Sequence, residues 1–190
     1  MALDFVNTQV KNHDEPVDLL TDFNQLTVWL TQAHLFDDIA MQAARQTWGN
    51  ATAGSTLLKQ SREFRQVIRQ MIDRIIHQNV IETETIEAIN TLLETRAGHL
   101  QLVADKEGYK TQFYYQATRP LHLLAPIAEA TAHFLDSATL SRLKQCGNPD
   151  CIRYFYDSTK NRSRRWCSME GCGNRMKVAA YYARKRNATT

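Results

Sequence analysis

The 190-residue sequence has no apolar run that approaches the ~20 residues needed to cross a membrane. Residues 1–15 turn polar and acidic early, so they lack the apolar core of a secretory signal peptide. We therefore expect a cytoplasmic protein with no membrane partner, in a reducing compartment where structural disulfides are rare.

The familiar sequence motifs of catalysis are also missing. There is no GxSxG, HExxH, P-loop or GxGxxG pattern, and the six histidines are scattered. An enzyme is therefore disfavoured, although one whose active site lies in residues 1–135 stays an alternative. The chain also lacks internal repeats and Gly/Ser-rich linkers, so we expect its parts to pack against one another.

Cysteine is scarce, and all four cysteines lie in one stretch. They form two pairs, Cys146/Cys151 and Cys167/Cys172, with four residues inside each pair and fifteen between the pairs. Four thiolates at ~2.3 Å complete the tetrahedral coordination of zinc and leave no open position for a catalytic water. We expect a structural Zn²⁺ site; two disulfides, or four unrelated buried thiols, are the alternative.

The residues around each pair favour the metal site. The first pair encloses Gly-Asn-Pro-Asp, a run of turn formers that aims two sulfurs at one point. Residues five apart on a regular helix point ~140° apart, so Cys167 should precede the terminal helix and Cys172 should lie in its first turn. Residues 152–156 alternate bulky β-formers and predict a short strand, and a further strand is expected to end at Trp166. This order of turn, strand, basic loop and helix predicts a treble-clef-like finger.

Charge is divided unevenly along the chain. Residues 141–190 hold 12 of the 23 Lys and Arg but only 3 of the 20 Asp and Glu, whereas residues 1–140 carry a net charge of −6. A basic, metal-stabilised segment on an acidic body is typical of nucleic-acid-binding proteins, and either DNA or RNA would fit it. The candidate phosphate-binding side chains are Arg162, Arg164, Arg165, Arg175, Lys177 and Arg184.

Two side chains of this segment keep two interpretations each. Trp166 could stack on a base or pack under the metal site, and Arg175 could contact DNA or brace the turn through backbone carbonyls. A stripe of the terminal helix is expected to face the metal site; it comprises Met176, Ala179, Ala180 and Ala183.

The region before the cysteines is predicted to be mainly helical, with a small antiparallel sheet. Alternating residues 99–104 and 109–116 predict a β-hairpin with Gly108 at a positive-φ position, and residues 2–8 are expected to supply a third strand. Apolar periodicity predicts helices over 19–30 with Asp18 as cap, 37–48, 57–76, 83–97, 126–135 and 139–144, with a helical turn at 120–125. The four arginines of the longest helix are interpreted as solvated surface; they are Arg62, Arg65, Arg69 and Arg74.

Two parts of the chain resemble a known pair of domains. CGNPDC at 146–151 and DSTKNRSRRWCSMEGCGNR at 157–175 resemble the CGNR zinc finger. LDFVNT at 3–8 resembles the start of the ABATE domain, which accompanies this finger in bacterial stress-response transcription regulators. One departure is the run at 157–160, where the family more often has Asp-Thr-Ser-Arg, so any role of a basic group at Lys160 is in doubt.

The resemblance implies an ABATE-like domain over 1–138 and a zinc finger over 139–190. The expected function is zinc-dependent binding of duplex DNA by a transcription regulator whose first domain senses a small-molecule effector. Polar groups at the ends of elements in that domain are candidates to contact such an effector, with ordinary capping and turn bonds as the alternative; they are Asn7, Thr8 and Arg119.

Overall fold

The computed structural model describes residues 1–12 and 15–187 as an α+β fold in which helices predominate. Its α-helices are α1 (Ala2–Val6), α2 (Phe23–Gln32), α3 (Asp38–Trp48), α4 (Thr52–Gln78), α5 (Thr83–Leu93), α6 (Ala125–Ser137) and α7 (Asn174–Asn187). Its strands are β1 (Gln9–Asn12), β2 (Glu15–Asp18), β3 (Gly98–Asp105), β4 (Gly108–Tyr115), β5 (Leu143–Gln145) and β6 (Tyr154–Tyr156). Two 3-10 turns, η1 (Pro120–Leu123) and η2 (Leu140–Arg142), and a π-helical segment, η3 (Met169–Gly173), lie between them. The predicted fold class is confirmed.

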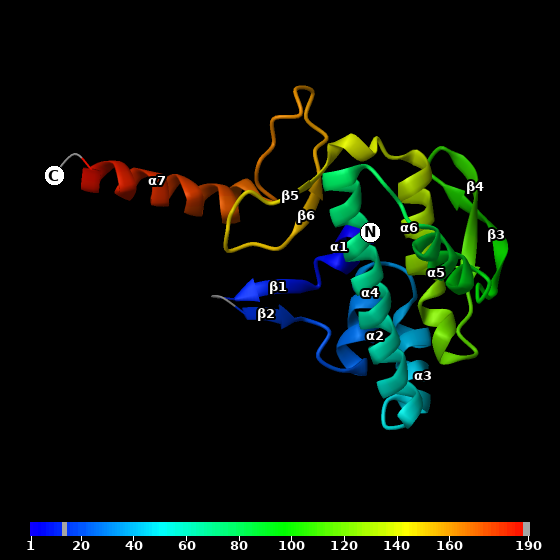
Figure 1. The fold of residues 1–190 in the computed structure, drawn as a ribbon. Coiled ribbons are helices and arrows are strands. Elements are labelled where there is room, and N and C mark those ends of the chain that lie inside the picture. Colours follow the sequence, from blue (N-terminus) through cyan, green and yellow to red (C-terminus); the bar gives the residue numbers. More distant parts are fainter. Residues whose placement is uncertain (13–14, 188–190) are drawn as a thin grey trace.

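Helix α4 runs through the middle of the body, and α1, α2, α3, α5 and η1 pack around it (Figure 1). Apolar side chains that recur every three or four positions on α4 point into the core, as the sequence predicted. Each such side chain, once fully buried, contributes roughly 1.5–3 kcal/mol. The buried apolar residues of α4 are Leu57, Leu58, Phe64, Ile68, Met71, Ile72 and Ile75.

Residues 2–8 do not form the predicted third strand. Ala2–Val6 is the short helix α1, which packs against α4 and α6. Its buried side chains are Ala2, Phe5 and Val6, at helical spacing on one face. In so short a segment, two-residue and helical periods are hard to tell apart, and contacts with α4 and α6 decide the outcome.

The strands form three separate antiparallel hairpins, β1–β2, β3–β4 and β5–β6. The β3–β4 hairpin was predicted, and Gly108 at its turn has φ of +133°. The β1–β2 hairpin occupies a segment that the sequence indicated as a polar loop, whose residues 13–14 lie outside the described ones. Residues 143–145, predicted to continue a helix, instead form β5 after the single turn η2.

Two helices begin at aspartates, one of them unexpected. Asp37 accepts a hydrogen bond from the Ala40 amide at 2.7 Å and caps α3, which begins where the sequence predicted a helix. Helix α2 is capped by Asp22, whose carboxylate accepts from the Gln25 amide at 2.8 Å, and not by Asp18. Asp18 is instead the last residue of β2, where it has a different role.

The interpretation of all four α4 arginines as solvated surface was wrong. Only 3% of Arg65 and 8% of Arg69 is exposed. Arg65 forms a bidentate ion pair with Asp18 and also donates to the Thr8 hydroxyl at 2.7 Å. Burial raises the pKa of the Asp18 carboxyl, but Arg65 and the Leu20 amide lower it more, so that this pKa lies below its ordinary value. The ion pair therefore ties β2 to the centre of the body.

The segment that carries the cysteines packs onto the body, as expected from the absence of a linker. Leu143 and Tyr154 belong to the same buried cluster as Phe5 and Ile68. The Tyr154 hydroxyl donates to the Asp73 carboxylate on α4 at 2.7 Å. Arg69 reaches across the boundary and donates to the Ile152 carbonyl at 2.9 Å. The two parts therefore share one core.

Helix α7 leaves this body and projects away from it (Figure 1). Among its residues none is buried, and Ala179 and Ala180 are exposed. The predicted packing of its small-residue stripe against the metal site was therefore wrong, because the helix extends beyond the finger. No helix within residues 1–12 and 15–187 combines the length and apolar character that spanning a bilayer demands.

Candidate metal centre and nucleic-acid surface

Four sulfur atoms converge at the base of α7. The ligand atoms of Cys146, Cys151, Cys167 and Cys172 all lie within 4.8 Å of one another, and all four are free thiols. The Sγ atoms of Cys151 and Cys167 are 3.7 Å apart, and those of Cys167 and Cys172 are 3.6 Å apart. A tetrahedral ion bound to sulfur at ~2.3 Å holds its ligands about 3.8 Å from one another. The cluster thus has the size and the donors of a metal-binding site.

The first cysteine pair is shaped by the hairpin that precedes it. The Cys146 amide donates to the Arg153 carbonyl at 2.9 Å, which extends the β5–β6 pairing by one step. Between the two cysteines, the buried Asn148 side chain accepts from the Asp150 amide at 3.1 Å. The Cys151 amide then donates to the Asn148 carbonyl at 2.9 Å and closes the turn.

The second pair uses an unusual helical turn. Cys167 precedes the helix and Cys172 lies in its first turn, as the spacing predicted. That turn is π-helical: the Gly173 amide donates to the Ser168 carbonyl five residues back, at 3.0 Å. Ser168 also caps it, because its hydroxyl accepts from the Gly171 amide at 3.1 Å. The wider turn brings Cys172 back toward Cys167.

Hydrogen-bond donors surround the sulfurs. The Asn148 amide and the Arg175 guanidinium lie 3.4 and 3.6 Å from Cys172 Sγ, and the Cys167 amide lies 3.4 Å from Cys146 Sγ. Burial raises the pKa of the Cys172 thiol, but Asn148 and the neighbouring thiols lower it to about 7. Burial raises the pKa of Cys167. Metal ligation requires thiolates, and donors of this kind stabilise that form.

Trp166 packs between the two turns. A Cβ added to Gly147 would lie 3.1 Å from Trp166 Cζ3, and one added to Gly173 would lie 3.1 Å from Trp166 Cδ1. The same Cβ on Gly173 would also approach Met169 Sδ to 2.5 Å. The indole thus packs closely against glycine on both sides, which favours the packing role of Trp166. The predicted strand ending at Trp166 is absent, because residues 157–168 are irregular.

Asp157 organises the basic loop after β6. Its side chain is fully buried and accepts hydrogen bonds from Lys144 Nζ at 2.7 Å, the Thr159 hydroxyl at 2.6 Å and the Arg164 amide at 3.0 Å. Burial raises the pKa of this carboxyl, but the bonds from Lys144 and Thr159 lower the pKa by more, so that it lies well below the usual range. A permanently charged centre therefore fixes the start of the loop.

Two family models match the chain. Residues 142–185 match the CGNR zinc finger. Residues 1–138, more than half of the chain, match ABATE, described as a putative stress-induced transcription regulator. The chain belongs to the ABATE family. No curated protein shows significant similarity to it.

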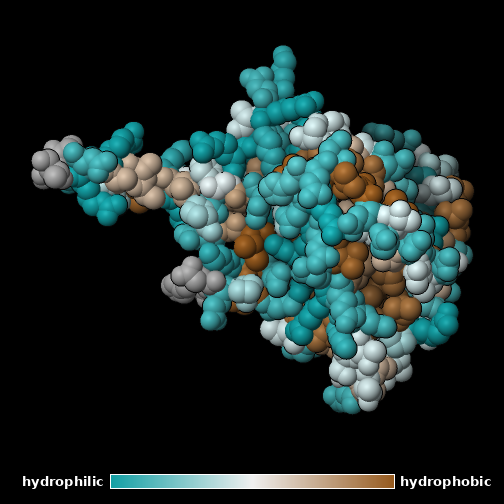
Figure 2. Space-filling view, in the orientation of Figure 1, coloured by the Kyte–Doolittle hydropathy of each residue, from teal (hydrophilic) through white to brown (hydrophobic). Residues whose placement is uncertain are grey.

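The candidate phosphate-binding residues of this ABATE protein lie on two elements, the loop after β6 and helix α7. Figure 2 shows hydrophilic side chains over that loop. Arg164 differs from the others because its guanidinium is half-buried over the Phe155 ring and donates to the Trp166 and Cys167 carbonyls. The remaining candidates are exposed; they are Arg162, Arg165, Arg175, Lys177 and Arg184.

Two of these residues also have structural contacts. Arg162 has φ of +51° and donates to the Ser141 hydroxyl at 3.3 Å. Arg175 contacts Cys172 Sγ, and not a backbone carbonyl as one interpretation held. Asn148 was not identified from the sequence as a hydrogen-bond donor to a cysteine sulfur. A signal for it exists, because Cys-Gly-Asn occurs at both 146–148 and 172–174.

The structure does not bring the three candidate effector-binding residues of the ABATE domain together. The Asn7 side chain exchanges two hydrogen bonds with the Tyr154 backbone, at 2.8 and 2.9 Å. Thr8 is buried, with its hydroxyl between the Phe5 carbonyl and Arg65. Arg119 lines a different surface hollow, where its Nε donates to His122 Nε2 at 3.0 Å.

Proposed function

We propose that this ABATE protein is a zinc-dependent regulator that binds duplex DNA through its C-terminal finger and senses a small molecule through its N-terminal domain. The convergence of four sulfurs beneath a basic loop and a projecting helix carries this proposal. Catalysis at the metal is not part of it, since a metal held by four thiolates keeps no open position for water. No membrane partner is proposed.

Zinc is the metal that suits the donor set. Four soft thiolates at tetrahedral spacing are typical of structural zinc sites. Asn148, Arg175 and the Cys167 amide would offset the negative charge that such a site carries. The ion would supply folding energy to the finger and no chemistry beyond that. Free thiols also fit the reducing cytoplasm in which we place the protein.

Duplex DNA is supported by the charge and shape beyond the metal site. Residues 141–190 carry a net charge of +9 when the cysteines are neutral. Four thiolates bound to one divalent ion add a net charge of about −2, so most of the positive charge remains. Helix α7 is slender because Ala179 and Ala180 expose little bulk, and a helix of ~10–12 Å diameter fits the ~12 Å major groove of B-DNA. The deep, narrow major groove of RNA does not admit such a helix. DNA is therefore favoured over RNA.

The sensing role is supported by the shared core. Asn7, at the end of α1, hydrogen-bonds to the backbone of Tyr154 in β6, and Arg69 on α4 hydrogen-bonds to the carbonyl of Ile152 just before it. A movement of α1 or α4 would therefore displace β6. An effector that shifts the N-terminal body would therefore change how the finger is presented.

The decisive experiment combines metal analysis with a salt titration. We expect one zinc per chain, and binding to a labelled duplex whose affinity falls with salt at a slope of about −0.9 per phosphate contacted. The double variant Lys177→Ala/Arg184→Ala should lose about two units of slope, while the same change at Lys59 and Lys106, on the body, should leave the slope unaltered. A structured RNA that displaces the duplex at equal concentration would overturn the DNA assignment.

A further inference from the structure

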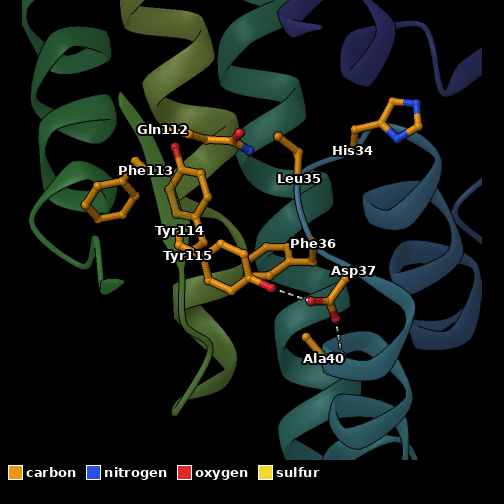
Figure 3. A pocket seen from close by; sticks show the side chains of 9 residues that line it. All are labelled: His34, Leu35, Phe36, Asp37, Ala40, Gln112, Phe113, Tyr114 and Tyr115. Carbon is orange, nitrogen blue, oxygen red and sulfur yellow. Dashed lines mark hydrogen bonds between the residues drawn. The ribbon is translucent and has the colours of Figure 1, made fainter. Parts of the chain in front are cut away.

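A second site lies on the body, between the α2–α3 connection and strand β4 (Figure 3). It is a cavity of about 500 Å³, and its walls come from segments about 75 residues apart in the chain. Phe36 and Asp37 lie on one side, and Phe113, Tyr114 and Tyr115 lie on the other. Aromatic rings therefore contribute to both sides of the cavity, and a single carboxylate stands beside them.

The rings are arranged with their edges and faces turned toward one another. The Phe36 and Tyr115 centroids are 5.9 Å apart, and those of Phe113 and Tyr115 are 5.0 Å apart at an angle of 68°. Aromatic faces carry partial negative charge and attract cations. The Phe113 ring already has such a partner, because the Arg96 guanidinium lies 3.5 Å from its centroid, so the other rings are the ones open to a ligand.

The carboxylate of Asp37 has no cationic partner among residues 1–12 and 15–187. It accepts hydrogen bonds from the Ala40 amide and the Tyr114 hydroxyl, each at 2.7 Å. These bonds, the Ala40 one first, hold the pKa of Asp37 below its ordinary value, so the group is ionised at neutral pH. The less exposed carboxylates of Asp18, Glu129 and Asp157 each pair with a basic side chain, whereas Asp37 is open to solvent.

We infer that this cavity binds a small organic cation of the alkylated ammonium class. Its methyl groups would contact the rings of Phe36, Tyr114 and Tyr115, and its charge would face Asp37. An anionic ligand would meet the Asp37 carboxylate at short range, and a purely apolar ligand would gain nothing from that charge. The inference deepens the proposed sensing function and rests on it only for its regulatory meaning.

The site is also connected to the finger. The Tyr115 hydroxyl donates to Glu129 on α6, and Phe134 on the same helix lies 6.1 Å from the Tyr156 ring in β6. The Thr139 amide, just after α6, donates to the Tyr156 hydroxyl at 3.2 Å. A ligand that displaces Tyr115 would therefore act on α6, the helix that contacts Tyr156 in β6.

Calorimetric titration of the full-length, zinc-loaded protein tests the inference without DNA. The probes are choline, benzyltrimethylammonium and 3,3-dimethyl-1-butanol, the last being the neutral counterpart of choline in shape. We expect at least one of the two cations to bind saturably and the neutral alcohol to bind about tenfold more weakly or not at all. Equal binding of the alcohol, or no binding of either cation, would overturn the proposal.

Variants locate the site. Asp37→Asn keeps a residue that caps helices well but removes the charge, so it should weaken cation binding about tenfold. Asp38→Asn, on the neighbouring exposed carboxylate, should change nothing. Tyr114→Phe keeps the ring and should keep binding, whereas Tyr114→Leu should lose it. Unchanged cation affinity in Asp37→Asn would refute the site. Because the titration contains no DNA, failure of the wild-type protein to bind DNA would refute the proposed function without affecting this test.

Discussion

Asn7 and Tyr154 lie 147 positions apart and exchange two hydrogen bonds. The Asn7 amide group donates to the Tyr154 carbonyl at 2.8 Å, and the Tyr154 amide donates to the Asn7 side-chain oxygen at 2.9 Å. A single side chain therefore acts toward β6 as a neighbouring strand would. It joins the ABATE domain to the zinc finger at the point where the finger enters the core.

Asn7→Ala should destabilise the protein. The substitution leaves one donor and one acceptor of Tyr154 without partners in a half-buried place, at a cost of about 1–3 kcal/mol. Denaturant unfolding measures this loss. Asn24→Ala, at an exposed position of α2, is the control and should stay within about 0.5 kcal/mol of wild type. Equal stability of the two variants would mean that the junction does not depend on Asn7.

Arg69→Met should be more costly. The methionine keeps the apolar stem but cannot donate to the Val6 and Ile152 carbonyls, and it leaves Tyr154 without its cation at 4.9 Å. We expect a loss of about 2–4 kcal/mol. Lys59→Met, on an exposed site of the same helix, is the matched control. A loss no larger than that of the control would show that the carbonyls find water instead.

The ion pair of Asp18 with Arg65 predicts a pH dependence of stability. Because the folded-state pKa of Asp18 is depressed, its contribution is present above the unfolded pKa of ~3.9 and is lost as pH falls through the folded value. Asp18→Asn should lower stability at pH 7 and flatten the acid side of the profile. Unfolding curves between pH 7 and pH 2 measure both effects, with Asp38→Asn as control. A parallel profile in Asp18→Asn would contradict the prediction.

Removal of the metal should disable the finger first. Zinc binding contributes roughly 10–16 kcal/mol in small fingers, so Cys167→Ser or a chelator should unfold residues after β6 and abolish DNA retention. Circular dichroism should retain the helical signal of residues 1–135. Because Leu143 and Tyr154 belong to the body's core, the melting temperature of the body should still fall. Undiminished DNA binding by Cys167→Ser would contradict the whole assignment.

Truncation after Lys177 separates binding from folding. Most of α7 buries nothing, so the melting temperature should change by no more than about 2 °C. DNA affinity should fall, and the salt slope should decrease by about 2–3 units because the basic residues 184–186 are lost. A large drop in melting temperature would show that α7 packs against the body in solution.

The metal site was predictable because its determinants are local. The spacing of the cysteines and the turn formers between them fix two ligands each, and helical geometry alone placed Cys167 before the helix. The π-helical form of that turn was not predictable, because it depends on Ser168 capping and on Trp166 packing against Gly147 and Gly173.

The buried arginines were missed because their partners are distant. Arg65 and Arg69 lie beside acidic residues on α4, as surface arginines do, and nothing nearby in sequence indicates Asp18 or the Ile152 carbonyl. The same reason explains α1, whose five residues acquire a helical form through contacts with α4 and α6. The alanine stripe of α7 led to the wrong prediction that it packs against the metal site. Small residues permit close approach to any surface, so their presence does not identify which surface they contact.

Under the proposed DNA binding, the length of α7 would set the footprint of one chain on the duplex. Its 14 residues extend about 21 Å, which corresponds to roughly six base pairs of duplex. A recognition half-site that short recurs by chance throughout any genome. An operator that is read selectively would therefore need two chains on neighbouring turns of the duplex, and its sequence would be a palindrome with the symmetry of that pair.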